Sequence, residues 1–421
     1  MLQVMSGSWA LYLGMFMLMI GNGLQGTLLG LRGDLEGFST FALSIIMSAY
    51  FVGFLFSSRM TPQMIRRVGH VRVFAALGST ISAVLILYPV LVEPWAWALG
   101  RVIIGFCFCG VYVTAESWLN DASTNATRGK ALSIYLMVQM AGIVAAQYIV
   151  SQGDISGYAL FIIPSVLVSM AFAPILLSVR PTPQFAQTKP MTIRRLIEAS
   201  PLGCVGMFLL GGVFSAQFGM SAVYGSQIGL TVGQISLFVS VIYIAALVAQ
   251  YPIGWISDHI DRRILILLVG FVGGFGALVA YFIPGNFGVI LFSAAILGGT
   301  SNPLYALLIA YTNDYLERED MAAASGGLLF INGIGAIAGP LIVGWMMETL
   351  GANGFWMFSS ILMFLVGFYA LYRMTRRSRS DLDTDGVSYV AVSSSASPVL
   401  VEVAQEAYVD AEIEEESQAN A

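Results

Sequence analysis

Two ionisable residues lie inside one long apolar stretch, where charge is costly. Arg101 and Glu116 are the only charged residues in the segment 95–119. A charged side chain at the centre of a membrane helix costs about 2.5–3.5 kcal/mol on insertion scales, so each needs a reason to be there. Arg101 could bind an anionic group or tune a proton site, or its guanidinium could simply reach the nearer membrane surface. Glu116 could bind and release a proton, or pair with an arginine at the end of its helix.

The spacing of these two residues limits how they can act together. Fifteen residues make about four helical turns, so Arg101 and Glu116 would share a helix face about 22 Å apart and could not pair directly. Arg32 lies at the end of the first apolar stretch, just before Asp34 and Glu36. It is either a cavity residue or one member of an ion pair at the membrane interface.

Uncharged polar side chains inside other apolar stretches are a second group of candidates. Asn22 and Gln25 are three residues apart and would share one helix face. Such side chains either contact a solute or form hydrogen bonds between helices. The same two interpretations apply to the remaining polar candidates, which are Gln139, Gln217, Tyr224, Gln227, Asn302 and Tyr305.

The composition indicates which elements must position these side chains. The chain is 57% hydrophobic and 10% charged, with a mean hydropathy of +0.80, whereas soluble proteins are about 25% charged. A soluble enzyme is therefore excluded, and we expect an all-α integral membrane protein. A spanning helix needs about 20 mostly apolar residues. Twelve such segments occur, at about 9–31, 41–61, 72–92, 95–119, 131–152, 157–179, 200–224, 232–256, 264–283, 287–312, 322–348 and 353–373.

Basic residues predict how the helices are oriented. If the N-terminus is cytoplasmic, all of the 19 Lys and Arg residues except Arg32 and Arg101 fall in cytoplasmic segments. The positive-inside rule therefore predicts that both termini are cytoplasmic, which in a bacterium means a multi-pass protein of the inner membrane. The first apolar stretch has no basic region before it, so we expect a retained helix rather than a signal peptide.

The chain divides into two similar halves. The polar, basic connection 180–199 would separate a first six-helix bundle, residues 1–179, from a second, residues 200–375. At an offset of 193, Gly105 lies over Gly298, and W-L-N-D from Trp118 lies over Y-T-N-D from Tyr311. A duplicated six-helix unit with a site between the repeats near the membrane midplane is the arrangement of transporters.

The last segment, residues 376–421, has a different composition. From Ser380 to the end it contains ten acidic residues and no Lys or Arg. A polar, charged segment of this kind buries too little apolar surface to fold. We expect a disordered acidic cytoplasmic tail that is dispensable for transport.

Two motifs resemble signatures of the major facilitator superfamily, a family of twelve-helix transporters, and the resemblance covers about residues 8–375. The loop signature G-x-x-x-D-R-x-G-R-R is matched by G-W-I-S-D-H-I-D-R-R in the second half, which supplies Gly254, Asp258, Arg262 and Arg263. The first-half copy, P-Q-M-I-R-R-V-G-H-V-R, supplies Arg67 and Gly69 but has Arg66 where the acid belongs.

Further motifs narrow this resemblance. The helix-four signature R-x-x-x-G occurs as R-V-I-I-G from Arg101. Together, G-N-G-L-Q-G-T-L-L-G-L-R, S-A-Y-F-V-G-F and A-E-S-W-L-N-D resemble the YcaD-like bacterial branch, whose substrate the resemblance does not supply. The G-x-x-x-G-P motif of drug/proton antiporters is absent from helix five, which reads V-Q-M-A-G-I-V-A-A-Q.

The resemblance also implies which charges meet at the cytoplasmic side. In this superfamily the helix 2–3 loop packs against the start of helix eleven, and the helix 8–9 loop against the start of helix five. Both contacts would close the cytoplasmic side, unless Arg66 merely follows the positive-inside rule. The predicted pairs are Arg66 with Glu319 or Asp320, and Asp258 with Arg128 or Lys130.

The leading hypothesis is a secondary transporter that moves a small solute by alternating access. Arg101 and Arg32 favour an anionic or zwitterionic substrate, and Glu116 favours proton coupling. The first alternative is an exporter of amphipathic drugs, which predicts an apolar, aromatic-lined cavity. The second is a non-transporting membrane sensor with the acidic tail as its effector.

Other classes of function lack the residues that they need. The sequence has no Ser/His/Asp set, P-loop or metal cluster, so we expect no enzyme activity, no cofactor and no bound nucleic acid. The expected partners are a small-molecule substrate, protons and the lipid bilayer, and we expect a monomer. His70 and His259 are expected to be solvated in loops, and the three cysteines are expected to be buried and unpaired: Cys107, Cys109 and Cys204.

Overall fold

The computed structural model describes residues 2–121, 125–176, 191–376, 389, 391 and 392, and every regular element among them is an α-helix. In chain order these are α1 (Leu2–Leu35), α2 (Thr40–Val68), α3 (His70–Leu87), α4 (Pro94–Asp121), α5 (Asn125–Gln152), α6 (Ala159–Leu176), α7 (Ile193–Ala199), α8 (Pro201–Gln227), α9 (Val232–Ser257), α10 (Arg262–Phe282), α11 (Phe287–Asn313), α12 (Arg318–Leu350) and α13 (Gly354–Arg376).

These helices confirm the predicted all-α membrane fold. Within the described residues, eleven helices are long and apolar enough to span a membrane. The apolar part of α6 is shorter, Ala159–Pro174, and this helix contains Pro164 and Pro174. Short polar caps begin several helices: Ser39, Thr231 and Asn286 each accept a hydrogen bond from a backbone N–H group in the first turn that follows.

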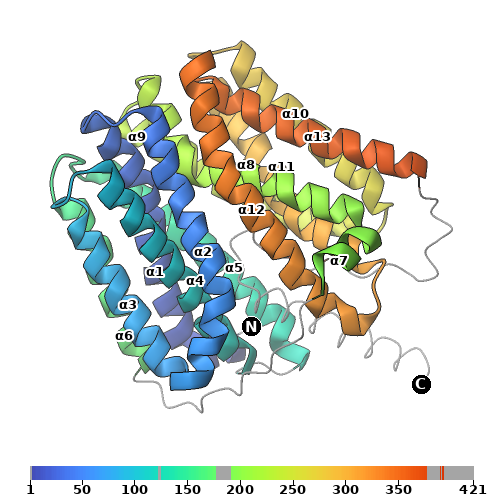
Figure 1. Ribbon diagram of the computed structural model, residues 1–421, viewed down its shortest axis with the longest axis horizontal. Helices are drawn as coiled ribbons and strands as arrows, with labels where there is room; N and C mark the ends of the chain where they lie inside the picture. The colour runs from blue at the N-terminus through green and yellow to red at the C-terminus, as the bar shows by residue number, and fades with distance from the viewer. Residues whose placement is uncertain (1, 122–124, 177–190, 377–388, 390, 393–421) are drawn as a thin grey trace.

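The two halves repeat the same packing. In Figure 1, α2, α3, α4 and α6 of the first half lie to the left, and α10, α12 and α13 of the second half lie to the right. In the first half α1 packs on α5 and α6, α4 packs on α2 and α3, and α3 packs on α6. In the second half α8 packs on α12 and α13, α11 packs on α9 and α10, and α10 packs on α13. Each pairing recurs one repeat later, which confirms the predicted duplication.

The matched glycines make equivalent contacts. A Cβ atom at Gly105 of α4 would overlap the carbonyl oxygen of Tyr50 of α2, and one at Gly298 of α11 would overlap the carbonyl oxygen of Ile242 of α9. A side chain at either position would push apart helices whose backbones touch. The sequence match between Gly105 and Gly298 therefore reflects one close helix crossing that is present in both halves.

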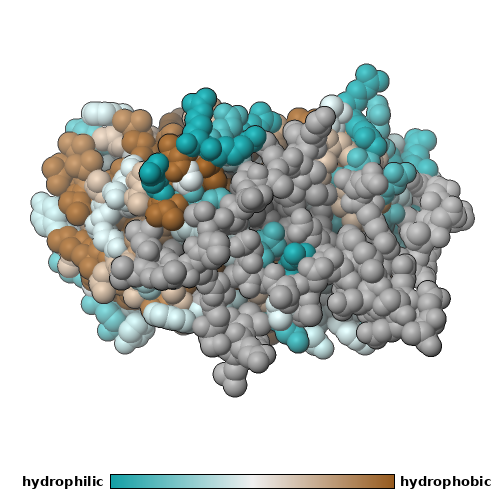
Figure 2. Space-filling model, turned by 90° about the horizontal axis from the view of Figure 1, so that it is seen from below, coloured by the Kyte–Doolittle hydropathy of each residue, from teal (hydrophilic) through white to brown (hydrophobic). Residues whose placement is uncertain are grey.

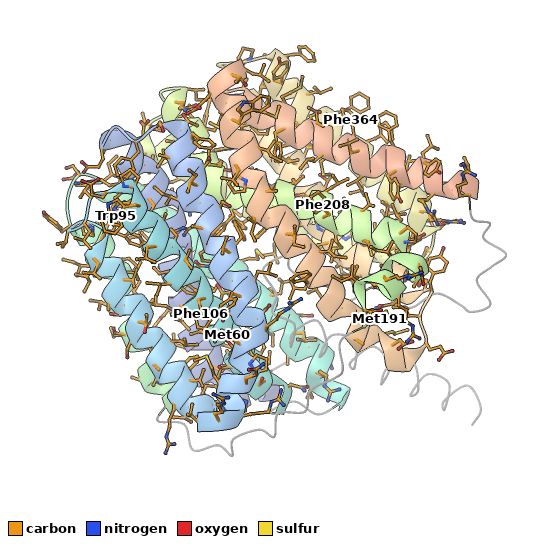
Figure 3. All side chains as sticks on the ribbon, viewed as in Figure 1. Met60, Trp95, Phe106, Met191, Phe208 and Phe364 are labelled. Carbon is orange, nitrogen blue, oxygen red and sulfur yellow. The ribbon has the colours of Figure 1, made fainter. Side chains whose placement is uncertain are left out.

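The outer surface of the bundle is apolar, as a membrane requires. Figure 2 shows hydrophobic residues on the left flank and hydrophilic groups on the end facing the viewer. Large side chains on this surface include Trp95 on α4, 68% exposed, and Phe208 on α8, 42% exposed (Figure 3).

Two local predictions are wrong. The connection 180–199 is not a loop throughout, because its last seven residues form α7, where the Thr192 hydroxyl accepts from the backbone N–H of Arg195 and Leu196 is buried. His70 is not solvated: it is the first residue of α3, is 3% exposed and packs beside Trp118 with 6.3 Å between ring centroids. His259 is exposed, as expected, and Cys107, Cys109 and Cys204 are buried and free.

Candidate functional site

The two ends of the bundle differ in charge and in how the halves meet. We call one end the basic end, because arginines gather there. Arg66 lies at the end of α2 and Arg376 at the end of α13, and Arg128 and Arg262 lie at the starts of α5 and α10. The other end, where α1 ends and α2 begins, is called the far end. In Figure 1 the basic end lies below for the helices of the first half and to the right for α13.

Hydrogen bonds join the two halves at the far end. The Ser226 hydroxyl donates to Asp34 at 2.6 Å, and the Gln227 amide donates to the Thr40 hydroxyl at 2.5 Å. The backbone N–H of Phe41 donates to Glu348 at 2.9 Å. These bonds tie α1 and α2 to α8 and α12, so the two halves are in contact at the far end in this conformation.

A central cavity lies between the halves on the basic side of these contacts. It contains about 540 Å³ of space between atoms, part of which is open to solvent. Four helices line it, two from each half. The lining residues are Asn22 of α1; Tyr50, Phe51, Phe54, Leu55 and Ser58 of α2; Phe214 and Phe218 of α8; and Leu329, Asn332, Gly333 and Ala336 of α12.

Aromatic rings dominate this lining and meet across the two halves. Phe218 of α8 lies 5.5 Å from Tyr50 and 6.0 Å from Phe51 of α2, measured between ring centroids. Phe214 stacks on Phe218 at 6.0 Å. These rings present flat apolar walls on which a planar group can stack.

Arg101 lies directly behind this aromatic wall. Its guanidinium carbon is 4.7 Å from the centroid of Tyr50 and 5.9 Å from that of Phe218, and its side chain is fully buried. Its Nη2 contacts the sulfur of Met47 at 3.6 Å, whereas Nε and Nη1 have no hydrogen-bond partner among the described residues. Cation–π attraction, about 2 kcal/mol when desolvated, offsets part of the cost of this burial. The positive charge of Arg101 therefore acts on a solute in the cavity across the rings of Tyr50 and Phe218.

Asn22 connects the cavity to the interior of the first half. Its amide nitrogen donates to the Tyr112 hydroxyl at 2.8 Å and to the Tyr50 hydroxyl at 3.4 Å. The amide oxygen of Asn22 accepts a hydrogen bond from the amide nitrogen of Gln25 at 3.0 Å, as their shared helix face predicted. The amide oxygen of Gln25 has no partner among the described residues. Of this pair, only Asn22 is among the lining residues of the cavity.

Glu116 lies further toward the basic end of α4. It is 1% exposed, and the Tyr135 hydroxyl of α5 donates to its Oε1 at 3.0 Å. Gln139, one turn beyond Tyr135, is also buried, and both polar atoms of its amide lack partners among the described residues. Tyr112 lies between Arg101 and Glu116 on α4, so polar groups occupy the helix face between the two charges.

Most polar candidates of the second half serve helix packing. Gln217 and Ser301 exchange hydrogen bonds of 2.9 and 3.3 Å between α8 and α11, and Tyr224 stacks on Phe355 at 5.2 Å. Asn302 and Tyr305 are different, because the Asn302 Oδ1 and the Tyr305 hydroxyl are buried without partners among the described residues.

Arg32 makes contacts that fit the interface interpretation, one of its two interpretations. Its Nε lies 2.6 Å from Glu36, and its Nη1 donates to the carbonyl oxygens of Ile155, at 3.0 Å, and of Ser156. The guanidinium thus fastens the end of α1 to the loop before α6, at the far end and away from the cavity.

The sequence matches the family described as Major Facilitator Superfamily over residues 11–224 and 202–403. This match covers most of the chain. The chain belongs to the major facilitator superfamily. The superfamily consists of transporters, so the protein is a multi-pass membrane protein and not an enzyme, as predicted.

Individual relatives agree with this assignment. The protein named Uncharacterized MFS-type transporter YcaD of Salmonella arizonae is 24% identical over 348 residues, which cover 81% of this chain and 88% of that protein. YcaD of Salmonella newport is 25% identical over 344 residues, with the same coverage. These relatives confirm the resemblance to the YcaD-like branch.

Solved structures share the fold at low sequence identity. The nucleoside transporter NupG has a TM-score of 0.70 at 15% identity and covers 88% of this chain and 100% of its own. A bacterial homolog of the human lysosomal transporter Spinster has a TM-score of 0.67 at 13% identity and covers 96% and 98%.

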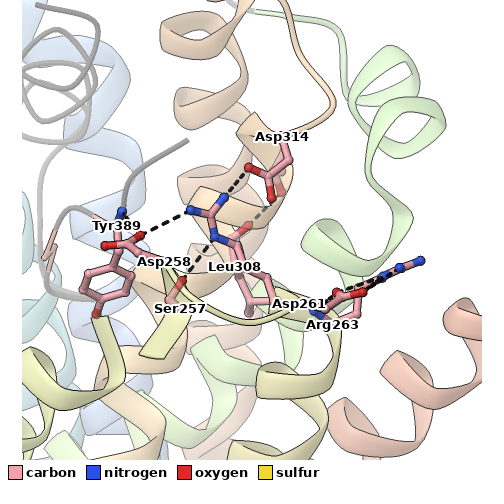
Figure 4. Close-up of polar contacts among 9 residues, drawn as sticks. Ser257, Asp258, Asp261, Arg263, Leu308, Asp314 and Tyr389 are labelled. Carbon is pink, nitrogen blue, oxygen red and sulfur yellow. Dashed lines mark hydrogen bonds and ion pairs between the residues drawn. The ribbon is translucent and has the colours of Figure 1, made fainter. Parts of the chain in front are cut away.

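The superfamily loop signature of the second half forms a compact ionic cluster at the basic end (Figure 4). Arg262 contacts Asp314 of α11, the Ser257 hydroxyl at 3.2 Å and Asp258 at 3.6 Å. Arg263 and Asp261 pair at 2.7 Å. These contacts fix the turn between α9 and α10 against the end of α11.

The charge pairs predicted across the halves stay predictions. Asp320 pairs with Arg195 of α7 at 2.6 Å, and the Glu319 side chain lies outside the described residues. Both Arg66 and Arg67 are exposed in the last turn of α2, which ends where Gly69 adopts a φ of 87°. Arg128 and Lys130 lie in the first turns of α5.

One more contact at this cluster comes from the C-terminal segment. The backbone N–H of Tyr389 donates to Asp258 at 2.8 Å, and the Tyr389 hydroxyl donates to the carbonyl oxygen of Pro303 at 3.4 Å. Burial and the nearby Asp258 carboxylate raise the pKa of Tyr389, so its hydroxyl remains a donor even well above neutral pH. At Tyr389, Ala391 and Val392 the expected solvated tail is therefore wrong, because these residues are packed against the helices.

Proposed function

We propose that the protein is a secondary transporter that carries a small solute through the central cavity by alternating access. The observation that carries the proposal is a cavity lined by both halves, with hydrogen bonds between the halves at the far end. With the basic end toward the cytoplasm of a bacterial inner membrane, as the positive-inside rule predicts, this conformation is inward-facing.

The lining favours a solute with a flat apolar or aromatic part and a polar edge. The rings of Tyr50, Phe51 and Phe218 supply stacking surfaces, and Asn22 and Ser58 place polar groups beside them. The guanidinium of Arg101 behind the rings disfavours a cationic solute and is compatible with a neutral, anionic or zwitterionic one. A nucleoside, the substrate class in the name of NupG, combines a planar base with a polar sugar and belongs among the first ligands to test.

Glu116 supports coupling to protons. It is buried beside Tyr135 and lies on the same helix face as Tyr112, whose hydroxyl accepts a hydrogen bond from the cavity-lining Asn22. A carboxyl group in this position can take up a proton from one side and release it on the other as the halves move.

The second candidate is an exporter of amphipathic drugs. The aromatic lining that this alternative predicted is present, which favours it. Arg101 opposes it for cationic drugs. The sensor alternative predicts no solute movement at all.

A ligand screen followed by a transport assay tests these possibilities. Purified protein is heated with nucleosides, sugars, organic acids and amphipathic cations, because a ligand at a hundredfold excess over its Kd adds about 2.7 kcal/mol of stability. Stabilising ligands are then offered to proteoliposomes with and without a pH gradient. Stabilisation by organic cations alone would favour the drug exporter, and a ligand that binds but never crosses the membrane would favour the sensor.

A further inference from the structure

Three residues of the C-terminal segment are placed at the basic end, between the two halves. We call Tyr389, Ala391 and Val392 the tail anchor. Tyr389 is held at both ends. Its backbone N–H donates to Asp258 (Figure 4), and its hydroxyl donates to the carbonyl oxygen of Pro303. A Cβ atom at Gly254 would lie 2.5 Å from its ring, so the signature glycine leaves the space that the ring fills.

Val392 enters deeper than Tyr389. It is 3% exposed and lines a second cavity that both halves surround. The other lining residues are Leu136 and Met140 of α5, Ala246, Leu247 and Gln250 of α9, and Asn302 of α11. The Nε2 of Gln250 and the Oδ1 of Asn302 are buried without partners among the described residues, which leaves hydrogen-bonding capacity in this groove.

The sequence around the anchor explains why this part of the tail fits. The ten acids of the tail fall on either side, with none between Asp385 and Glu402. Burying an unpaired carboxylate is costly, so the acidic parts are poor occupants of an apolar groove. The uncharged run Y-V-A-V, from Tyr389 to Val392, supplies apolar side chains and, at Tyr389, a backbone donor for Asp258.

We propose that the groove formed by α5, α9 and α11 at the basic end is a binding site for the tail anchor, and that the docked anchor obstructs access to the central cavity from this end. The docking itself does not depend on the proposed function, whereas its effect on solute movement does. Val392 lies between α5 of the first half and α9 of the second, so the basic end cannot close fully until the anchor leaves. The anchor therefore also favours the conformation with the far end closed.

Cysteine crosslinking tests the docking. In a full-length protein whose three buried cysteines are replaced by alanine, Val392→Cys combined with Leu247→Cys should form a disulfide under mild oxidation. The matched control is Val392→Cys with Val248→Cys, because Val248 is the next residue of α9 but is 68% exposed on the outer surface. Equal crosslinking of the two pairs, or none of the first pair, would overturn the docking.

Thiol labelling tests the obstruction without any knowledge of the solute. Ser58 lines the central cavity, so the thiol of a Ser58→Cys variant reports access to it by a maleimide. If the anchor occupies the groove in two-thirds of molecules, truncation after Arg379 should speed labelling about threefold. The variant Val392→Asp, which places a charge in the groove, should do the same.

A control separates this effect from a general change in the protein. The thiol of an Arg194→Cys variant, at a position that is 90% exposed on α7, should label at one rate in the full-length and truncated chains. Unchanged labelling of Ser58→Cys on truncation would overturn the obstruction. Because neither measurement uses transport, a failure to find transported solutes would refute the proposed function and leave both results interpretable.

Discussion

Glu116 is buried on α4 and accepts a hydrogen bond from Tyr135. If its carboxyl group carries the coupling proton, Glu116→Gln should keep the shape and the hydrogen bond but lose the proton. We expect the variant to lose accumulation driven by a pH gradient while it still exchanges solute across the membrane. Proteoliposomes loaded with the solute found by the ligand screen measure both activities.

The control keeps the carboxyl group and removes its donor. Tyr135→Phe should retain gradient-driven accumulation, at a lower rate. Accumulation by Glu116→Gln at the normal level would rule out the coupling role and leave Glu116 as a structural partner of α5.

Phe218 contacts rings of the opposite half and lies beside Arg101. One aromatic contact is worth about 0.5–1.5 kcal/mol, so Phe218→Ala should raise the KM of the solute up to about tenfold. Phe208→Ala is the matched control, since Phe208 lies on the same helix but on the outer surface, 42% exposed. An equal effect of both substitutions would show that α8 has been destabilised rather than that a binding surface has been lost.

The sequence drew attention to the polar candidates of the site more than to its apolar lining. Arg101, Glu116 and Asn22 stand out because polar groups in apolar stretches are costly. Phe214 and Phe218, four residues apart on α8, gave a weaker signal, since aromatic residues at helical spacing are also common in cores and on lipid-facing surfaces. Which face of α8 meets the cavity depends on packing between distant halves, which hydropathy does not encode.

At the scale of the helices, one close crossing occurs in each half of the bundle. Gly105 and Gly298 each allow one helix backbone to touch another. Gly105→Ala should force α2 and α4 apart, and overpacking of this kind costs about 1–3 kcal/mol. We expect a lower Tm for the purified variant. Gly129→Ala is the control, because Gly129 lies inside α5 with open space around it and alanine favours a helix. A Tm for Gly105→Ala at or above that of Gly129→Ala would contradict the close crossing.

Hydropathy predicted the long helices, because a membrane requires about 20 apolar residues in each spanning helix. The residues matched at an offset of 193 predicted their duplication. It did not predict α7, which is short and is stabilised by the cap from Thr192 and the burial of Leu196. Nor did it predict the placement of Tyr389 and Val392, because the acidic composition around them indicated a solvated tail. In both cases tertiary contacts decide the outcome.

At the scale of the whole molecule, the conformation depends on which end the two halves close. Hydrogen bonds accepted by Asp34, Thr40 and Glu348 join the two halves at the far end here. Two acids at the basic end have partners outside the first half: Asp320 pairs with Arg195 of the connecting α7, and Asp258 with Arg262. Alternating access requires contacts that stabilise the opposite state, with the basic end closed.

We expect the charges of the two signature loops to supply those contacts. In that state Arg66 would meet Glu319 or Asp320, and Asp258 would meet Arg128 or Lys130. An exposed pair is worth no more than about 1 kcal/mol, yet that shifts a two-state equilibrium about fivefold. Arg66→Asp alone should therefore slow solute uptake, because the basic end would close less often.

Reversing the opposing charges decides whether the pair exists. Adding Glu319→Lys and Asp320→Lys to Arg66→Asp should restore the initial rate of uptake, since attraction is recovered with the signs exchanged. Asp320→Lys alone is the control, because it removes only the ion pair with Arg195. This pair is exposed and so contributes little to stability. If uptake by the triple variant is no faster than uptake by Arg66→Asp, then Arg66 reflects only the positive-inside rule. Other groups must then close the basic end.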